Sequence, residues 1–113
     1  QDKAKEKSLP WSVAKGFDTF SGVSDFHPFS GDVEILKNLN FSLLVNNEIR
    51  QQGNTKDMIF SIPQIISYLS TVFTLSPGDI IFTGTPAGVS PLKVGDKMLA
   101  QLDGLASLNL GVI

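Results

Sequence analysis

Cysteine is absent from the 113 residues of this chain, and histidine is almost as scarce. Without cysteine the chain has no disulfide bridge and no thiolate zinc site, which fits a reducing compartment. The single histidine, His27, stands directly before a proline. A lone histidine in a loop is more often structural or solvated than catalytic, so we assign His27 no role.

Long apolar runs and an excess of basic charge are also missing. No apolar run approaches the roughly 18 to 20 residues needed to cross a bilayer, so we expect no membrane segment. Nine Lys and Arg stand against eleven Asp and Glu, a formal charge of −2. Since no basic stripe is available to neutralise the phosphates of a duplex, we expect no nucleic acid partner.

What the chain does have is 42% hydrophobic residues, with ten glycines and six prolines. These glycines and prolines separate short apolar runs, a pattern typical of a globular domain built from short strands. One domain is the limit at this length, and so small a domain gains stability from a partner surface.

Two hairpins are predicted. Residues 39–45 form a strand candidate, and Asn46-Asn47 can adopt the positive φ values of a tight turn before residues 48–52 run back. Residues 97–102 and 106–112 flank Asp103-Gly104, a preferred hairpin dipeptide, and the second run alternates apolar and polar side chains.

A third apolar run and a helix complete the central part. Residues 80–82 follow the turn Ser76-Pro77-Gly78-Asp79, and their length suits a buried strand. Ser61 and Gln64 have capping-box spacing, with a proline in the first turn between them. Apolar residues then recur at helical spacing, so we expect an amphipathic helix to about Phe73 whose apolar face is core or part of a subunit interface.

The amino-terminal part is less regular. Residues 2–7 are good helix formers, and Pro10 ends any helix before it. Residues 11–26 are predicted to be an irregular extended stretch. The whole pattern predicts a mostly β fold with one main helix, of the α+β class.

Three motifs stand in a fixed order along the chain. They are Pro10-Trp11-Ser12-Val13-Ala14-Lys15-Gly16-Phe17-Asp18-Thr19-Phe20, then Arg50-Gln51-Gln52-Gly53-Asn54-Thr55 with Met58-Ile59-Phe60, then Gly78-Asp79-Ile80-Ile81-Phe82-Thr83-Gly84-Thr85-Pro86-Ala87-Gly88-Val89. Over nearly its whole length the chain resembles the fumarylacetoacetate hydrolase family. The resemblance is nearest to the short acylpyruvase and oxaloacetate decarboxylase branch.

The resemblance implies a mixed β-sandwich roll and a metal-dependent enzyme. In that family a Glu-x-Glu pair and a later Asp bind one Mg²⁺ or Mn²⁺, and this Asp opens a motif that ends in Arg-Asp-x-Gln. Gln1 resembles that last glutamine. We therefore expect residues 1–113 to be the C-terminal portion of one catalytic domain, with every metal ligand upstream of Gln1 and none in this chain.

The resemblance also assigns roles to three side chains. Lys15 matches the catalytic lysine of the family, whose ammonium group would stabilise a developing oxyanion. Thr85 matches a threonine that contacts substrate, and Gln1 matches a glutamine that binds substrate oxygens. The simpler alternatives are a surface ion pair for Lys15, an ordinary turn for Thr85 and a solvated helix residue for Gln1.

The implied activity is cleavage of a C–C bond in acylpyruvates, or decarboxylation of oxaloacetate, through a pyruvate enolate. Two alternatives stay open: a hydroxymuconate-type isomerase or decarboxylase of aromatic catabolism, and a catalytically incomplete dimerisation module. The implied partners are a small keto-acid substrate and a second copy in a homodimer. The expected location is the cytoplasm or the mitochondrial matrix.

The Arg50-Gln51 pair has no role that the resemblance assigns. An arginine just after a hairpin turn can grip a carboxylate with two parallel hydrogen bonds. We favour a structural ion pair instead.

Overall fold

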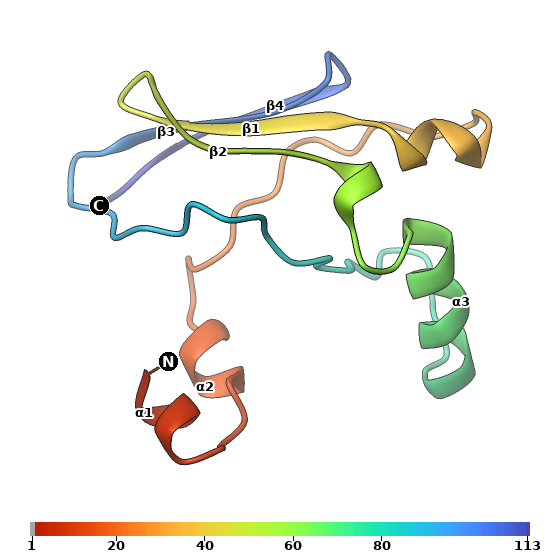
Figure 1. Cartoon of the computed structure of the whole chain (residues 1–113), viewed down its shortest axis with the longest axis horizontal. Helices are drawn as coiled ribbons and strands as arrows, with labels where there is room; N and C mark the ends of the chain where they lie inside the picture. The colour runs from red at the N-terminus through yellow and green to blue at the C-terminus, as the bar shows by residue number, and fades with distance from the viewer. Residues whose placement is uncertain (1) are drawn as a thin grey trace.

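The computed structural model describes residues 2–113, and Gln1 lies outside this range. Its centre is a four-stranded antiparallel sheet of order β2-β1-β3-β4 (Figure 1). The prediction of a mostly β fold with one main helix is confirmed, as are both hairpins. The strands are β1 (Asn40–Val45), β2 (Glu48–Asn54), β3 (Lys97–Leu102) and β4 (Ala106–Gly111).

Both hairpin turns use the residue types that tolerate positive φ. Asn46 and Asn47 have φ values of 51° and 67°, and Asp103 and Gly104 have values of 31° and 72°. Asparagine, aspartate and glycine reach this region at the lowest cost. The Asn46 side chain also accepts a hydrogen bond from the Lys97 backbone N–H at 2.9 Å, which ties the first turn to the start of β3.

The β1–β2 ladder contains one irregularity. Leu44 lies opposite Ile49, but the preceding residue of β1, Leu43, lies opposite Gln51. Arg50 is therefore an extra residue in β2. A bulge of this kind bends its strand and changes the direction of the neighbouring side chains. Gln51, Leu43, Ala100 and Leu108 therefore form one row across the sheet.

The main helix, α3 (Ile62–Val72), extends from one end of the sheet (Figure 1). Its predicted start is confirmed, because the Gln64 side chain accepts a hydrogen bond from the Ser61 backbone N–H at 2.8 Å. The expected amino-terminal helix is also present as α1 (Asp2–Glu6). Two 3₁₀ turns, η1 (Val33–Lys37) and η2 (Thr55–Asp57), flank the β1–β2 hairpin.

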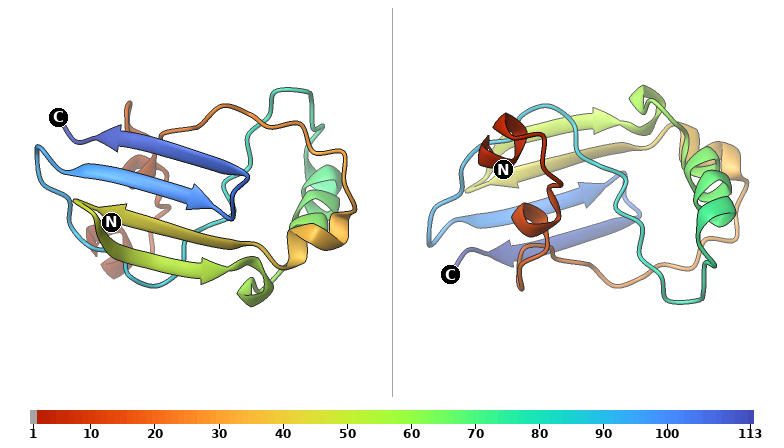
Figure 2. Two further views of the ribbon diagram at one scale, coloured as in Figure 1. Left: turned by 90° about the horizontal axis from the view of Figure 1, so that it is seen from above. Right: turned by 90° about the horizontal axis from the view of Figure 1, so that it is seen from below.

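Two local predictions are wrong. The extended stretch expected from residue 11 begins with a short helix, α2 (Ser12–Lys15), in which the Trp11 carbonyl accepts a hydrogen bond from the Ala14 N–H at 2.9 Å. Residues 80–82 are not a strand, since they pair with no strand among residues 2–113. The chain here crosses below the sheet instead of following an edge (Figure 2), so ladder hydrogen bonds cannot form.

Little of the apolar surface is covered. Leu39 and Val45 are the buried hydrophobic residues of the described part of the chain. The expected buried face of α3 is only partly covered: η1 lies against the helix and Ile62, Ile65 and Leu69 are half-buried, but Ile66 is 44% exposed and Phe73 at the C-cap 61%. The radius of gyration is 15.6 Å, whereas a compact domain of this length has about 13 Å. The fold therefore offers a large apolar surface to a further layer.

Candidate functional site

The glycine-rich loop at residues 84–88 is attached to β2 by one side chain. The Gln51 amide nitrogen donates hydrogen bonds to the Thr85 hydroxyl at 2.9 Å and to the Pro86 carbonyl at 3.1 Å. The Ala87 carbonyl lies at 3.4 Å from the same nitrogen, at the limit for a hydrogen bond. Three successive loop residues thus converge on a single amide of the sheet.

Gly88 brings the loop backbone against the strand backbone. Its φ of +98° is a conformation that side chains rarely adopt. A Cβ atom built there would overlap the Arg50 carbonyl oxygen and lie 3.2 Å from the Gln51 Cγ. Glycine is therefore required at position 88, and the bulge at Arg50 is the surface on which the loop rests.

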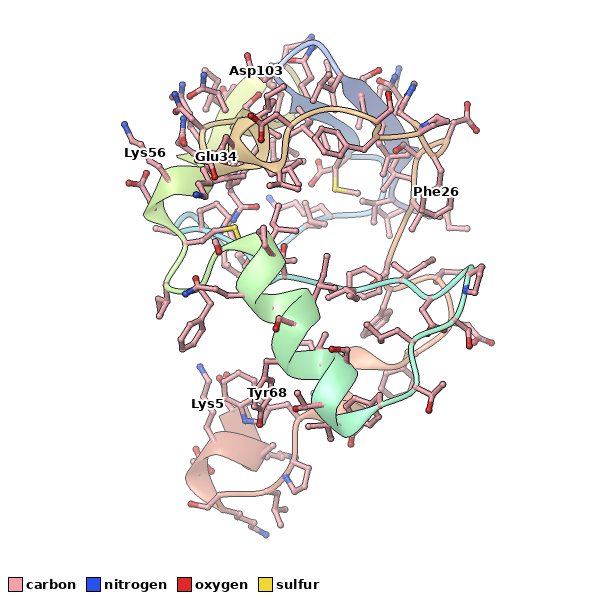
Figure 3. All side chains as sticks on the ribbon, turned by 90° about the vertical axis from the view of Figure 1, so that its right-hand side faces the viewer. Lys5, Phe26, Glu34, Lys56, Tyr68 and Asp103 are labelled. Carbon is pink, nitrogen blue, oxygen red and sulfur yellow. The ribbon has the colours of Figure 1, made fainter. Side chains whose placement is uncertain are left out.

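A cavity of about 480 Å³ opens between this loop and one face of the sheet. Thr85 and Gln51 lie in its wall together with the cross-sheet row of Leu43, Ala100 and Leu108. Residues of the segment 22–26 close another side. Phe26 is labelled in Figure 3, beside the sheet. Mostly apolar walls with a few converging polar groups are typical of small-molecule sites.

The hydroxyl group of Thr85 accepts one hydrogen bond from the protein and keeps its own proton available as a donor. One lone pair of the oxygen accepts the Gln51 N–H, and the hydroxyl proton has no acceptor among residues 2–113. A threonine hydroxyl carries one donor and two acceptor positions. Thr85 can therefore donate to an oxygen atom of a molecule in the cavity, such as a carboxylate or ketone.

Lys15 lies apart from this cavity. It is the last residue of α2, in the lobe at the opposite side of the molecule from the sheet (Figure 1), and its side chain is exposed. It does not line the cavity, and within the described chain its ammonium group has no hydrogen-bond or ion-pair partner. Lys5, in the same lobe, instead stacks over Trp11 at 5.5 Å (Figure 3). The structure thus brings Thr85 and Gln51 together without Lys15, and Gln1 lies outside the described residues.

Of the Arg50-Gln51 pair, the glutamine makes the contacts with the loop. Arg50 forms the expected ion pair, with its Nη2 3.9 Å from the Glu48 Oε2, but both side chains are largely exposed. Such a pair contributes about 0 to 1 kcal/mol. These contacts of Gln51 were not predicted. The sequence shows only that Arg50-Gln51 follows a hairpin turn, and this does not reveal the bulge that places Gln51 beside the loop.

The acidic residues of the described chain do not form a metal centre. Among residues 2–113, no three His, Asp or Glu side chains are close enough together to hold a metal ion. A hard divalent cation needs several oxygen ligands, so the residues present do not fit Mg²⁺ or Mn²⁺ by themselves. The origin of the metal ligands therefore stays a prediction.

The most perturbed carboxylate, Asp96, has a structural role. The Lys93 backbone N–H and the Asn46 amide both donate to it at 2.8 Å and hold its pKa below the ordinary value of 3.8. These bonds join the residue 93–96 turn to the β1–β2 turn.

None of the helices between residues 2 and 113 combines the length and the apolar character needed to cross a membrane.

The fold is an antiparallel sheet with a threonine-bearing glycine loop over a mostly apolar cavity. The sequence model described as fumarylacetoacetate (FAA) hydrolase C-terminal matches residues 1–113. The chain belongs to the fumarylacetoacetate hydrolase family.

Several similar proteins are named for oxaloacetate or fumarylpyruvate chemistry. The chain is 48% identical over 112 residues to oxaloacetate tautomerase FAHD1, mitochondrial, of Arabidopsis thaliana, and 46% identical over 105 residues to oxaloacetate decarboxylase, mitochondrial, of Dictyostelium discoideum. These matches cover 99% and 93% of this chain, but 50% and 48% of the relatives. Fumarylpyruvate hydrolase from Pseudomonas aeruginosa, in complex with Mn²⁺ and pyruvate, is similar in structure, with a TM-score of 0.90 and 37% identity. That match covers the whole of this chain and 48% of the other.

Proposed function

We propose that this chain is the substrate-contacting half of a metal-dependent enzyme that acts on short keto acids, by decarboxylating oxaloacetate or cleaving acylpyruvates. The observation that carries the proposal is the match of almost the entire chain to relatives named for oxaloacetate chemistry. The Thr85 hydroxyl at an apolar cavity supports it, since a keto acid offers both a carboxylate and a ketone oxygen as acceptors.

Both proposed reactions require stabilisation of negative charge on the same oxygen atom. Loss of CO₂ from oxaloacetate breaks the C3–C4 bond, and hydrolysis of an acylpyruvate breaks the bond between C3 and the acyl carbon, which receives water. Both leave an electron pair that becomes an enolate, with negative charge on the C2 oxygen of pyruvate. A positive charge or hydrogen-bond donor beside that oxygen lowers the barrier.

In this proposal Lys15, which does not line the cavity in this structure, supplies the positive charge from the α2 lobe, and Thr85 supplies a hydrogen bond from the cavity wall. At about 4 Å two unit charges attract by roughly 4 kcal/mol at intermediate dielectric, enough to account for a large rate effect. Mg²⁺ or Mn²⁺, when bound, would add Lewis-acid stabilisation of the same charge, and its ligands are expected upstream of Gln1.

The proposal includes an upstream portion of the same catalytic domain. Two observations support this: the chain spans about half the length of the relatives, and much of its apolar surface is open. That portion would cover the cavity and face Lys15, and Gln1 would contribute to substrate binding. A homodimer would cover further apolar surface. The names of the eukaryotic relatives favour a mitochondrial location.

A second candidate function is the keto–enol tautomerisation of oxaloacetate, favoured by the name of the Arabidopsis relative. This reaction moves a proton from C3 to the C2 oxygen and breaks no C–C bond. It would use the same stabilisation of charge on that oxygen, so the product decides between the two candidates.

The test uses the protein with its upstream portion and Mg²⁺, supplied in turn with oxaloacetate, acetylpyruvate and a hydroxymuconate-type diacid. Release of pyruvate from the first two supports the proposal, and interconversion without pyruvate identifies the tautomerase. Lys15→Ala should lower kcat by at least ~10²-fold, because the charge opposite the enolate oxygen is lost. The matched control is Lys56→Ala, on exposed η2 at the level of the sheet (Figure 3). An unchanged kcat in Lys15→Ala would exclude the role of Lys15.

A further inference from the structure

We propose that Gln51 is a positioning residue that holds the Thr85 hydroxyl as a hydrogen-bond donor toward an oxygen atom of the bound keto acid. The inference rests on the proposed function and adds to it a residue that acts through Thr85. It stands on the three contacts that one amide makes with the loop and on the register of β2.

The contacts determine which end of the Gln51 amide faces the loop. Two of the three loop atoms are the carbonyl oxygens of Pro86 and Ala87, which can only accept hydrogen bonds. The NH₂ group must therefore face the loop, because the amide oxygen would repel both carbonyls. The nitrogen has two hydrogens, and the shorter distances assign them to Thr85 and Pro86.

The amide in turn fixes the direction of the Thr85 hydroxyl. Because Gln51 donates to the Thr85 oxygen, the hydroxyl proton cannot point at Gln51 and must point elsewhere. Both side chains line the same cavity and Thr85 is exposed, so the hydroxyl proton is free to meet an oxygen atom of a molecule bound there. A preoriented donor needs no reorganisation when charge develops on its acceptor.

The sheet keeps this amide in place. Gln51 is half-buried and lies opposite Leu43, inside the pairing of β1 with β2. The Gly88 backbone rests on the Arg50 carbonyl directly beside it, so the two ends of the loop segment from Thr85 to Gly88 contact consecutive residues of one strand. The position of the Thr85 hydroxyl therefore depends on β2.

Adjacent Gln52 offers a matched control. Neighbouring residues of a strand point to opposite faces, and Gln52 is exposed and does not line the cavity. Gln51→Leu and Gln52→Leu make the same chemical change in the same strand, but only the first removes the amide from Thr85.

The experiment measures kcat and KM for oxaloacetate in the protein with its upstream portion and Mg²⁺. Five proteins are compared with the wild type: Gln51→Leu, Gln52→Leu, Thr85→Val, the double variant Gln51→Leu with Thr85→Val, and Gln51→Glu. We expect Gln51→Leu to lower kcat/KM about 10- to 100-fold, the effect of misplacing one substrate-orienting group, and Gln52→Leu to change it less than about threefold.

The double variant separates positioning from general support of the fold. If Gln51 acts through the hydroxyl, adding Gln51→Leu to Thr85→Val should lower kcat/KM less than about threefold further, because the hydroxyl is already gone. A full additional 10- to 100-fold loss would overturn the inference. If Gln51→Leu does not fold, Gln51→Glu keeps the side-chain length while its carboxylate accepts from Thr85, and it should show the same loss.

The outcomes distinguish the two proposals. If Thr85→Val lowers kcat/KM more than tenfold while Gln51→Leu behaves like Gln52→Leu, positioning by Gln51 is refuted and the proposed function stands. If Thr85→Val matches the wild type, the role of Thr85 fails and the positioning role fails with it. Absence of turnover in the wild-type protein would instead refute the proposed function itself.

Discussion

Gly88→Ala tests whether the glycine-rich loop is fixed by backbone contact with the bulge in β2. Alanine at this position meets two obstacles, an unfavourable φ of +98° and the Arg50 carbonyl oxygen, which the new Cβ would overlap. Gly78→Ala is the matched control. Gly78 has a φ of +99° but no atom within 4 Å of a Cβ, so this variant meets the first obstacle alone.

The two obstacles have different magnitudes. A side chain at positive φ costs about 1 to 2 kcal/mol, which applies equally to both variants. In Gly88→Ala the loop must also move away from Arg50 by on the order of 1 Å to restore ordinary contact. That shift breaks the 2.9 and 3.1 Å bonds from Gln51 to Thr85 and Pro86, at about 0.5 to 1.5 kcal/mol each. The expected loss is therefore about 2 to 5 kcal/mol for Gly88→Ala and about 1 to 2 kcal/mol for Gly78→Ala.

The assay is urea unfolding followed by circular dichroism, with the free energy of unfolding extrapolated to water. A difference of at least about 1 kcal/mol between the two variants would support the reasoning, provided that the denaturant slope is unchanged. Equal destabilisation of the two variants would show that the φ value alone matters and that the contact with Arg50 is dispensable.

Three further predictions concern other parts of the molecule. Because its hydrogen bonds lower the pKa of Asp96, the ionised form stabilises the fold above the unfolded pKa, and this contribution disappears as the pH falls through the folded pKa. The stability advantage of the wild type over Asp96→Asn should thus shrink as the pH falls below 3.8, and a difference that stays constant there would contradict this. Gln64→Ala should cost about 0.5 to 1.5 kcal/mol in urea unfolding, since the Ser61 N–H at the start of α3 loses its acceptor; an unchanged midpoint would exclude this cap. Under the proposed function, a chelator should abolish pyruvate release and Mn²⁺ should restore it, whereas full turnover in the chelator would refute metal dependence.

Local chemistry made the hairpins and the main helix predictable. Asn46-Asn47 and Asp103-Gly104 specify their turns through backbone preferences that hold in any surroundings. The helix start at Ser61 likewise needs only residues within one turn. These elements could be identified because their determinants are adjacent in the sequence.

The wrong predictions concern segments whose structure depends on residues that are distant in the sequence. An apolar run such as residues 80–82 becomes a strand only if a sheet edge is available, and in this fold the segment crosses below the sheet. The apolar spacing of α3 predicted the helix but not how far it is covered, because that depends on elements distant in the sequence, of which η1 lies against it in the described chain. Periodicity shows which face is apolar and does not identify its neighbour.

The candidate site was predictable in part. The Gly-Thr-Pro motif indicated Thr85, and the structure does place Thr85 at a cavity. The side chain that holds it could not be chosen from the sequence, because Arg50 and Gln51 are neighbours with opposite directions in a regular strand. The assignments of Lys15 and Gln1 stay predictions, because Lys15 does not line the cavity and Gln1 lies outside the described residues.

The extra residue in β2 determines the charge beside the loop. If pairing continued unbroken from the Asn46-Asn47 turn, Arg50 would stand opposite Leu43 and its guanidinium would point where the Gln51 amide now lies. A permanent cation there would attract the carboxylate of any acidic ligand and compete with the threonine for it. By shifting the register by one position, the strand presents a neutral partner, so an anionic product would leave without breaking an ion pair at this point.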